Sequence, residues 1–555
     1  MDTTSYWLDT SKPSKFPKLR KNLTVDAVVV GGGITGVTAA YLLKKAGLKV
    51  ALLERGAIGG VDTPYTTAHL TYVIDLRLKD LVKSFGKDHA KGAWDAGNAA
   101  IDQIQEIVQF RNISCDFSRV PHYLHASLKG DGKSERSRFK DEAQLAEDLG
   151  FAATYLDSVP LMNRPGIRFA NQARFHPLKY IGGLVKDVSG DGSHVFEETE
   201  AKEFSDDPLS VNTEGGRVSC GFIVIATHVP LMGNTNMASA TLLQSKLAPY
   251  SSYVVGAKLT KERPEALYSD TSDPYYYLRI DRRPGGYYAI FGGEDHKTGQ
   301  VEETGQQYRN LEKTLTGLLP DAKVDHRWSG QVVETNDGLP LIGETAKRQF
   351  VSTGYAGNGM TFGTLGAMMA RDAALGRKNP WSELFDVHRK KLKGGTWDYL
   401  KENFDYPYYM IKDRLAADQT KSTNSVKRGE GKILKVDGQR VAVSRDAEGK
   451  LSQVSAICTH MGCIVHWNMA EKTWDCPCHG SRFKPNGEVM AGPAESPLEQ
   501  VKAKPPTKSE AAPAKSKPAA KSKPAVKGKS PAKSKRAAVK KKSIPTKRKA
   551  AKSKK

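Results

Sequence analysis

Apolar residues gather in short runs near the start of the chain, and their spacing changes from one run to the next. Residues 24–30 form an apolar run that predicts a buried strand. Residues 34–46, rich in Ala and Leu, predict a helix, and Lys49 to Leu53 predict a second strand that ends before Glu54. This order is typical of a βαβ unit.

Two later segments, the apolar run 222–226 and residues 349–353 before Gly354, predict further strands of the same sheet. Because long mixed stretches separate them, we expect an α/β Rossmann-like nucleotide-binding domain that the chain leaves and re-enters, with an α+β substrate domain built from the intervening residues. This oxidoreductase region spans 24–380. We expect its nucleotide-binding parts at about 24–75, 200–245 and 325–380, and the substrate domain at about 76–200 and 245–325.

The remaining segments differ in composition. Residues 1–23 are polar and predict an N-terminal arm, and residues 381–421, rich in Trp, Tyr and charge, predict a linker or packing arm. Short alternating runs from 422 to 500 predict a small all-β domain. Residues 501–555 consist mainly of Lys, Ala, Pro and Ser without aromatic residues, so we expect this tail to be disordered.

The charge of the chain is concentrated in that tail. The formal net charge is +23, but residues 501–555 hold 21 Lys and Arg against the single acid Glu510, which leaves +3 for the other 500 residues. This division excludes a protein that is a nucleic-acid-binding fold throughout. The tail resembles those of linker histones in composition, and it predicts non-specific contact with nucleic acid or another anionic surface, or simple solvation.

Targeting signals and cysteine content bear on location. No window holds the roughly 18 consecutive apolar residues of a membrane span, and the N-terminus has no apolar signal region. Six cysteines in 555 residues are few, which fits a reducing compartment. We therefore expect a cytoplasmic protein.

A glycine-rich turn follows the first predicted strand. Gly31-Gly32-Gly33-Ile34-Thr35-Gly36 matches G-x-G-x-x-G at the head of the predicted helix, and Glu54 follows 18 residues after Gly36. Such glycines let the backbone approach a pyrophosphate at a helix N-terminus, and the acid accepts hydrogen bonds from ribose hydroxyls. The pattern predicts dinucleotide binding, with ordinary loop glycines as the alternative; it does not choose between FAD and NAD.

A family resemblance makes that choice. Val28-Val-Val-Gly-Gly-Gly-Ile-Thr-Gly36 with Leu53-Glu-Arg55 resembles the opening of the D-amino-acid oxidase and glycine oxidase family. Trp328-Ser-Gly-Gln331, Asp337-Gly-Leu-Pro340 and Gly354-Tyr-Ala-Gly-Asn-Gly-Met360 resemble its C-terminal flavin-closing segment. The resemblance implies FAD, with covalent attachment through His69 as a variant seen in some relatives. The implied FAD-binding residues are Gly31, Gly32, Gly33, Ile34, Gly36, Glu54, Arg55, Thr66, Thr67, Gly354, Gly357, Gly359, Met360 and Thr361.

One departure from that family concerns the substrate. Amine-oxidising relatives often carry Lys after the aromatic residue of the closing segment, whereas here Thr361 follows Met360. Arg279 is a candidate for binding a carboxylate, Tyr277 lies in the same segment, and His176 or the run Glu294–Lys297 could supply a base. For these residues a surface ion pair or a satisfied core histidine is the alternative. The hydride chemistry itself belongs to the cofactor.

The C-terminal cysteines and histidines form a second motif. Cys458-Thr-His460 and Cys476-Pro-Cys478-His479 offer two thiolates and two imidazoles from two loops. This donor set fits a 2Fe-2S centre in which two histidines replace two cysteines on one iron. A Cys2His2 zinc site is the alternative, but zinc fingers place Cys pairs and His pairs on separate arms.

Residues 430–500 resemble the Rieske proteins of respiratory cytochrome complexes. The resemblance implies that Cys458 and Cys476 bind one iron and that His460 and His479 bind the other. It further implies a disulfide between Cys463 and Cys478. Ser481 matches a serine that bonds a bridging sulfide in high-potential members, but Phe483 stands where they have Tyr. Since hydrogen bonds to sulfur raise the potential, we predict a potential below that of the respiratory proteins.

Together these motifs predict an FAD-dependent dehydrogenase. The order of domains resembles bacterial FAD-dependent oxidoreductases that carry a C-terminal Rieske domain. We expect a small amine, amino acid or related substrate to give a hydride to FAD, and the cluster to relay electrons to an external acceptor. The alternatives are an amine oxidase with a structural or regulatory cluster, and a nucleic-acid-associated redox sensor tethered by the tail.

Overall fold

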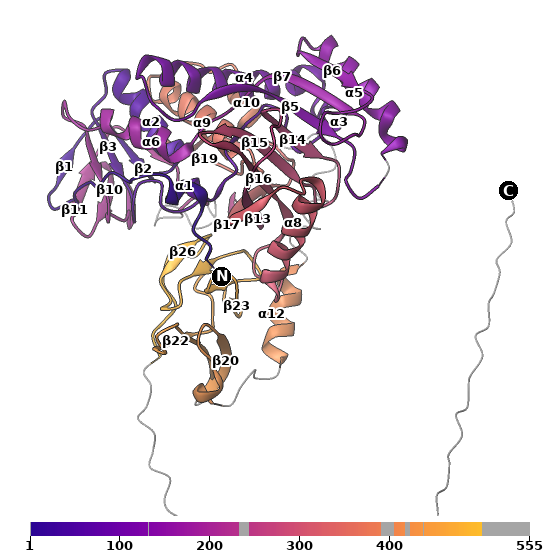
Figure 1. Cartoon of the computed structure of the whole chain (residues 1–555). Coiled ribbons are helices and arrows are strands. Elements are labelled where there is room, and N and C mark those ends of the chain that lie inside the picture. Colours follow the sequence, from indigo (N-terminus) through magenta and orange to yellow (C-terminus); the bar gives the residue numbers. More distant parts are fainter. Residues whose placement is uncertain are drawn as a thin grey trace, which may run out of the picture. The chain divides into compact units, whose positions relative to one another are not determined.

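The computed structural model describes residues 2–130, 132–231, 243–389, 405–416, 422–436 and 438–501 (Figure 1). The predictions for the basic tail beyond Val501, and for residues 390–404 and 417–421 of the linker, lie outside the described residues. No described helix has the length and apolar character needed to cross a bilayer.

A mainly parallel sheet carries the nucleotide-binding part. The predicted βαβ unit is confirmed as β2 (Ala27–Val30), α2 (Ile34–Lys45) and β3 (Val50–Leu53), and both strands are buried along their whole length. Parallel sheets are covered on both faces, which is why these strands are continuous apolar runs. The sheet order is β18-β19-β12-β2-β3-β8. The other strands are β8 (His194–Phe196), β12 (Phe222–Ile225), β18 (Leu341–Ala346) and β19 (Gln349–Thr353).

Helices pack closely over this sheet. Helix α2 packs on α9 (Gly359–Ala374), and α9 in turn packs on α4 (Lys87–Phe110). A Cβ atom at Gly36 would lie 1.8 Å from the carbonyl oxygen of Gly31, so only glycine allows this approach of helix to turn. Further described helices are α1 (Tyr6–Asp9), α3 (Leu78–Phe85), α5 (Arg136–Asp148), α6 (Pro177–Leu184) and α10 (Ser382–Phe385).

A second, nine-stranded sheet forms the substrate domain, with β17 and β4 at its ends and α8 (Thr304–Leu318) packed on β13 and β16. Its strands in order are β17 (Lys323–Thr335), β13 (Leu247–Leu259), β16 (Gly286–Lys297), β15 (Tyr277–Arg283), β14 (Ala266–Asp270), β5 (Ser118–His125), β7 (Gly166–Arg174) and β4 (His69–Leu70); β6 (Ala153–Leu156) pairs with β7.

Three short segments belong to a different sheet from the one expected. Strands β4 and β17 lie within the predicted nucleotide-binding parts but pair in the substrate-domain sheet, whereas β8 lies within the predicted substrate domain and pairs with β3. The apolar pattern predicts that a segment is a strand, but its partner depends on long-range packing. A small sheet of β1 (Leu23–Thr24), β11 (Gly216–Ser219), β10 (Leu209–Thr213) and β9 (Glu203–Asp206) completes this region.

The predicted all-β domain is confirmed over the C-terminal described residues. It contains two small antiparallel sheets around a core that includes Trp474 and Phe483, both 0% exposed. Helix α12 (Asp405–Leu415) from the linker packs on it, with Asp413 3.0 Å from His466. The strands are β20 (Gly431–Val436), β21 (Gln439–Arg445), β22 (Leu451–Ser455), β23 (His466–Asn468), β24 (Thr473–Asp475), β25 (Arg482–Phe483) and β26 (Val489–Ala491).

Candidate active site and metal centre

The glycine-rich turn forms one end of a long cavity. Gly31 has φ +105°, and a Cβ there would lie 2.4 Å from the carbonyl oxygen of Ala226, so the turn requires glycine. Glu54 accepts hydrogen bonds from the amides of Gly32 and Gly56, both at 2.7 Å. Burial raises the pKa of Glu54, and these two bonds oppose that rise. Gly31, Gly32, Gly33, Ile34, Glu54 and Arg55 all line the cavity.

The C-terminal domain closes the same end of the cavity. Met490, Ala491, Gly492 and Ala494 line it together with the glycine-rich turn. Nη2 of Arg55 donates a hydrogen bond to the carbonyl oxygen of Met490 at 3.0 Å. A dinucleotide bound at this end would therefore contact both domains.

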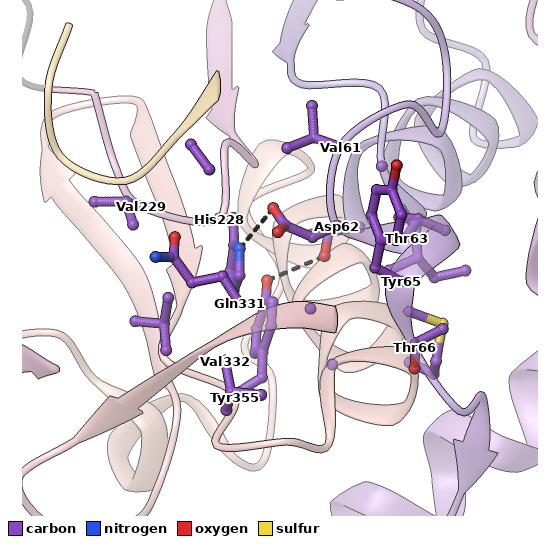
Figure 2. Close-up of a pocket in the computed structure, with 18 of the residues that line it drawn as sticks. Val61, Asp62, Thr63, Tyr65, Thr66, His228, Val229, Gln331, Val332 and Tyr355 are labelled. Atoms are coloured by element: carbon purple, nitrogen blue, oxygen red, sulfur yellow. Dashed lines mark hydrogen bonds and ion pairs between the residues drawn. The ribbon is translucent and has the colours of Figure 1, made fainter. Parts of the chain in front are cut away.

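An ion pair lies in the middle of the cavity wall. Nδ1 of His228 is 2.7 Å from a carboxylate oxygen of Asp62 (Figure 2). Burial lowers the pKa of His228, but the Asp62 carboxylate outweighs it, so the pKa lies above its ordinary value. The charge of His228 is thus balanced within the protein.

The predicted flavin-closing segment lies along the cavity in part. Gly357, Gly359 and Met360 line it, and Tyr355 bonds Thr35 of α2 at 3.0 Å. Thr361 is fully buried beside it, where its hydroxyl accepts a hydrogen bond from the amide of Thr71 at 3.2 Å. Gly354 and Gly36 do not line the cavity but allow close packing of neighbouring residues. Thr66 and Thr67 line it directly.

Two carboxyl groups and two tyrosines face the far end of the cavity. The hydroxyl of Tyr275 donates to Asp75 at 3.2 Å, and the hydroxyl of Ser252 donates to Asp295 at 2.5 Å and also bonds Tyr277. The side chain of Asp75 is exposed to the cavity, and that of Asp295 is half-buried. Burial raises the pKa of each carboxyl to about 7, with a further rise for Asp75 from the charge of Asp295.

Two histidines at this end are neutral. Burial lowers the pKa of His69 and of His122 to about 3. Nδ1 of His69 lies 2.8 Å from the hydroxyl of Thr67. His69 lines the cavity, as covalent flavin attachment would require, but that attachment stays a prediction.

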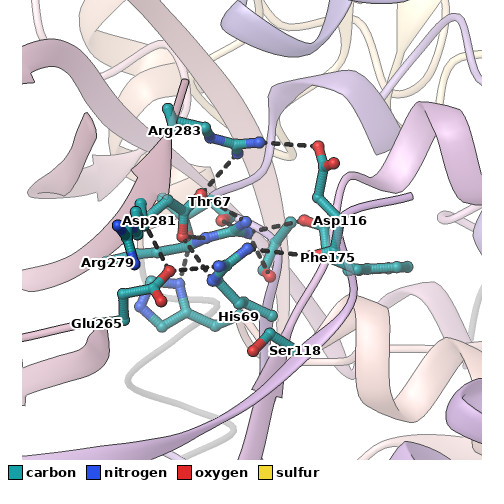
Figure 3. Close-up of polar contacts among 12 residues, drawn as sticks. Thr67, His69, Asp116, Ser118, Phe175, Glu265, Arg279, Asp281 and Arg283 are labelled. Carbon is teal, nitrogen blue, oxygen red and sulfur yellow. Dashed lines mark hydrogen bonds and ion pairs between the residues drawn. The ribbon is translucent and has the colours of Figure 1, made fainter. Parts of the chain in front are cut away.

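The three predicted catalytic residues occupy different places, and only Tyr277 lines the cavity. Arg279 is fully buried and paired with Asp281 at 2.8 Å (Figure 3). Its Nη1 donates to the carbonyl oxygens of Thr67, Ala68 and Phe175. This arrangement argues against the expected contact with a substrate carboxylate: Arg279 positions the loop that carries Thr67.

His176 also lies away from the cavity. It is fully buried, its Nδ1 accepts from the amide of Lys179 at 3.3 Å, and its Nε2 is 3.0 Å from the hydroxyl of Thr10. Burial lowers its pKa to about 3. These contacts correspond to a satisfied core histidine that caps α6 rather than to a base near a substrate.

The cysteines and histidines of the C-terminal motif come together. The rings of His460 and His479 lie 5.0 Å apart, and Cys458 and Cys476 face one another with a hydrogen bond between their thiols. Nδ1 of His460 is buried with no hydrogen-bond partner among the described residues, and burial lowers the pKa of this imidazole to about 4. A neutral imidazole with a buried lone pair and two adjoining thiols fit the 2Fe-2S centre.

A disulfide ties the two loops of this centre. Cys463 and Cys478 are bonded, as the resemblance implies. Sγ of Cys476 lies within 4.8 Å of both bonded sulfurs, but a disulfide does not ligate iron, so Cys463 and Cys478 are not ligands. The Ser481 hydroxyl bonds Cys458 and also accepts from the amide of Ala494 at 3.1 Å.

The two loops contact the oxidoreductase region directly. Nε2 of His460 lies 3.1 Å from Oε1 of Gln244, whose Nε2 donates to the carbonyl oxygen of Pro230 at 3.1 Å. Gln331, which lines the cavity, donates to the carbonyl oxygen of Gly480 at 2.7 Å. Gln244 therefore joins the His460 loop to the segment of Pro230, and Gln331 joins the loop of Gly480 to the cavity wall.

Comparison with known proteins agrees with this geometry. Residues 26–373 match the FAD dependent oxidoreductase family, and residues 419–502 match the Rieske 2Fe-2S domain. The chain belongs to the FAD-dependent oxidoreductase family. This oxidoreductase uses FAD and a Rieske 2Fe-2S cluster, as predicted.

Three relatives illustrate its place in the family. A Bacillus subtilis protein named for a Rieske 2Fe-2S iron-sulfur centre is 31% identical over 90% of this chain and 97% of its own. Gamma-glutamylputrescine oxidoreductase of Escherichia coli is 23% identical over 74% of this chain and 99% of its own. The crystal structure of glycine oxidase from Geobacillus kaustophilus shares the fold, with a TM-score of 0.56 and 17% identity over 66% of this chain and 99% of its own.

Several site residues carry no signal in the sequence. Gln244, Gln331 and Ser252 are isolated polar residues whose roles depend on which segments meet in space. Asp295 lies in the run that sequence analysis named as a possible source of a base, and Tyr275 lies two residues before Tyr277. Asp75 follows an apolar stretch, and a polar residue directly after such a stretch is the one signal that could have pointed to it.

Proposed function

We propose that this enzyme is a dehydrogenase that oxidises a small amine-bearing substrate and delivers the electrons through the Rieske centre to an external one-electron acceptor. In the balanced reaction, the C–H bond beside the amine breaks, its hydride goes to FAD, and an iminium product leaves. Bound FAD accepts two electrons together and releases them singly, and the cluster carries one at a time.

The single observation that carries this proposal is the contact between His460 and Gln244. The resemblance assigns the imidazoles of His460 and His479 to one iron of the cluster. Here the Nε2 atom of one of them meets the oxidoreductase region at 3.1 Å. A purely structural cluster would not need this contact.

The residues of the chain perform distinct tasks in this reaction. The turn Gly31–Gly36 and Glu54 hold the dinucleotide, Arg279 fixes the loop of Thr67, and Met490 with its neighbours covers the dinucleotide end of the cavity. Asp75 and Asp295, with pKa values of about 7, can accept the proton that an ammonium substrate must lose before hydride transfer.

The proposal is tested by removing the cluster. Cys458→Ser deletes a ligand, and we expect it to abolish reduction of ferricyanide or cytochrome c while an amine substrate still bleaches the flavin. Cys220→Ser, a change outside the motif, is the matched control and keeps acceptor reduction. Rapid oxygen consumption by both proteins, with acceptor reduction unaffected by Cys458→Ser, would favour the amine oxidase alternative.

A further inference from the structure

The far end of the cavity contains an arrangement that the family resemblance did not lead us to expect. Asp75 from the loop after β4 and Asp295 from β16 line it together with Tyr275 and Tyr277. The centroids of the two tyrosine rings lie 5.5 Å apart. The hydroxyl of Tyr275 bonds Asp75 directly, whereas that of Tyr277 bonds Ser252, which in turn bonds Asp295. These elements belong to the substrate domain, away from the glycine-rich turn.

This site adjoins the flavin-closing segment. A Cβ at Gly357 would lie 3.3 Å from the hydroxyl of Tyr275 and 3.6 Å from Oδ2 of Asp75. A molecule held between the carboxyls would therefore lie beside the residues that the resemblance places near the flavin ring. That is the position a substrate must occupy.

Among the residues that the structure describes, the two carboxyls have no positive partner. Among the described residues no lysine lines the cavity, and its one arginine, Arg55, is bonded at the opposite end to Met490. His69 and His122 are neutral, and the charge of His228 is balanced by Asp62. Two neighbouring carboxylates in one cavity repel one another, and a cationic ligand between them would supply the opposite charge that the cavity wall lacks.

The same arrangement disfavours an amino acid. The carboxylate next to the amine of an amino acid would lie among Asp75, Asp295 and the electron-rich tyrosine faces, and Arg279 cannot reach it because its guanidinium is committed to Asp281 and backbone carbonyls. An ammonium group, in contrast, gains carboxylate hydrogen bonds and contact with the faces of the two rings.

We infer that Asp75, Asp295, Tyr275 and Tyr277 form an ammonium-binding site, and that the substrate is a cationic amine with no carboxylate on its reacting carbon. This inference rests on the proposed function, because it names the substrate class of that reaction. The four residues determine specificity: they select the charged amine and reject its α-carboxylated counterpart.

A probe that cannot react separates binding from turnover. Tert-butylammonium has no hydrogen on its α-carbon, and pivalate has the same shape with the opposite charge. With the full-length enzyme loaded with FAD and cluster, we expect calorimetry and the flavin difference spectrum to show binding of tert-butylammonium but not of pivalate. We expect Asp75→Asn and Asp295→Asn each to weaken it by about 10- to 100-fold, the range for a hydrogen bond to a charged group.

A neighbouring carboxylate provides the matched control. Glu294 precedes Asp295, but its oxygens accept from Tyr276 and Asn310 outside the cavity. The charge of Glu294 raises the pKa of Asp295, so we expect Glu294→Gln to leave the affinity unchanged or slightly higher, and not to weaken it as the Asp variants do. Unchanged affinity in both Asp variants, or tighter binding of pivalate than of tert-butylammonium, would overturn the inference.

The same test can be made with substrates, by comparing an amine with the amino acid that carries the same side chain. Putrescine and ornithine differ only by the α-carboxylate, as do butylamine and norvaline. We expect the amine of each pair to bleach the flavin faster, and preference for the amino acids would overturn the inference while leaving electron transfer to the cluster intact. If tert-butylammonium binding depends on Asp75 but reduced flavin never reduces the cluster, the proposed function fails and the ammonium site stands.

Discussion

Nε2 of His460 lies 3.1 Å from Oε1 of Gln244, so an imidazole of the Rieske centre touches the oxidoreductase region of the same chain. Because Gln244 also bonds the carbonyl oxygen of Pro230, the contact is anchored to a segment that continues into the cavity wall at Val229. The two redox parts of this protein are therefore joined by a defined side chain rather than by a linker alone.

Loss of Gln244 should slow the transfer between the two cofactors. The hydrogen bond helps to hold the imidazole against the cavity wall, and a bond of this kind contributes about 0.5–1.5 kcal/mol, or a factor of roughly two to ten. We expect Gln244→Ala to reduce the rate of cluster reduction by that factor after flash reduction of the flavin. Gln144→Ala, at a glutamine on α5 that bonds only Asp148, should leave the rate unchanged.

Ser481 should set the potential of the cluster. Its buried hydroxyl bonds Cys458, and a hydrogen bond to a ligand sulfur stabilises the reduced, more negative cluster. Removing a bond of about 0.5–1.5 kcal/mol corresponds to roughly 20–65 mV for a one-electron couple. We expect Ser481→Ala to lower the midpoint by that amount in a redox titration, and Ser481→Thr to preserve it. A midpoint equal to that of the respiratory Rieske proteins would contradict the prediction drawn from Phe483.

Affinity for a cationic probe should depend on pH. The pKa values of Asp75 and Asp295 are about 7, so both carboxyls are largely neutral at pH 6 and ionised at pH 8. Burial raises the pKa values of Tyr275 and Tyr277 well above 10 and lowers those of His69 and His122 to about 3, so these four side chains stay neutral throughout.

Tert-butylammonium should therefore bind more tightly as the pH rises from 6 to 8, by up to about tenfold per pH unit for each carboxyl that must ionise. Calorimetry of the parent enzyme and of Asp75→Asn across this range measures the effect. The variant should show a shallower dependence, and an affinity that falls as the pH rises would refute the assignment.

The C-terminal domain should also help to retain FAD. Arg55 bonds the carbonyl oxygen of Met490 where both domains enclose the dinucleotide end of the cavity. We expect Arg55→Ala to raise the dissociation constant of FAD by about two- to tenfold, measured by flavin fluorescence after dialysis. Arg20→Ala, at an exposed arginine of the N-terminal arm, serves as the control.

Local sequence signals predicted the elements, a dinucleotide site and the 2Fe-2S centre, because each has a chemical requirement that few residues meet; the choice of FAD came from the family resemblance. Gly31, Gly33 and Gly36 permit backbone contacts that a side chain would block, and Cys458, His460, Cys476 and His479 are a donor set that suits few metals. Residues 222–226 form a continuous apolar run, whereas 349–353 has only Phe350 and Val351 apolar and is recognised by its position before Gly354.

The substrate end could not be predicted in the same way. Arg279 was a plausible carboxylate ligand by residue type, but Asp281, two positions later on the same face of β15, occupies its guanidinium. Asp75 and Asp295 are 220 positions apart and acquire a shared role only when β4 and β16 meet around one cavity. Pairing over such separations has no local pattern.

The most direct test of the central claim is freeze-quench EPR under anaerobic conditions. The full-length enzyme is mixed with butylamine or putrescine, and the flavin absorbance and the signal of the reduced Rieske cluster are followed together. The account predicts that the flavin bleaches and that the cluster signal rises with it or immediately afterwards, without oxygen. A bleached flavin beside a cluster that stays oxidised, although dithionite reduces it, would contradict the account.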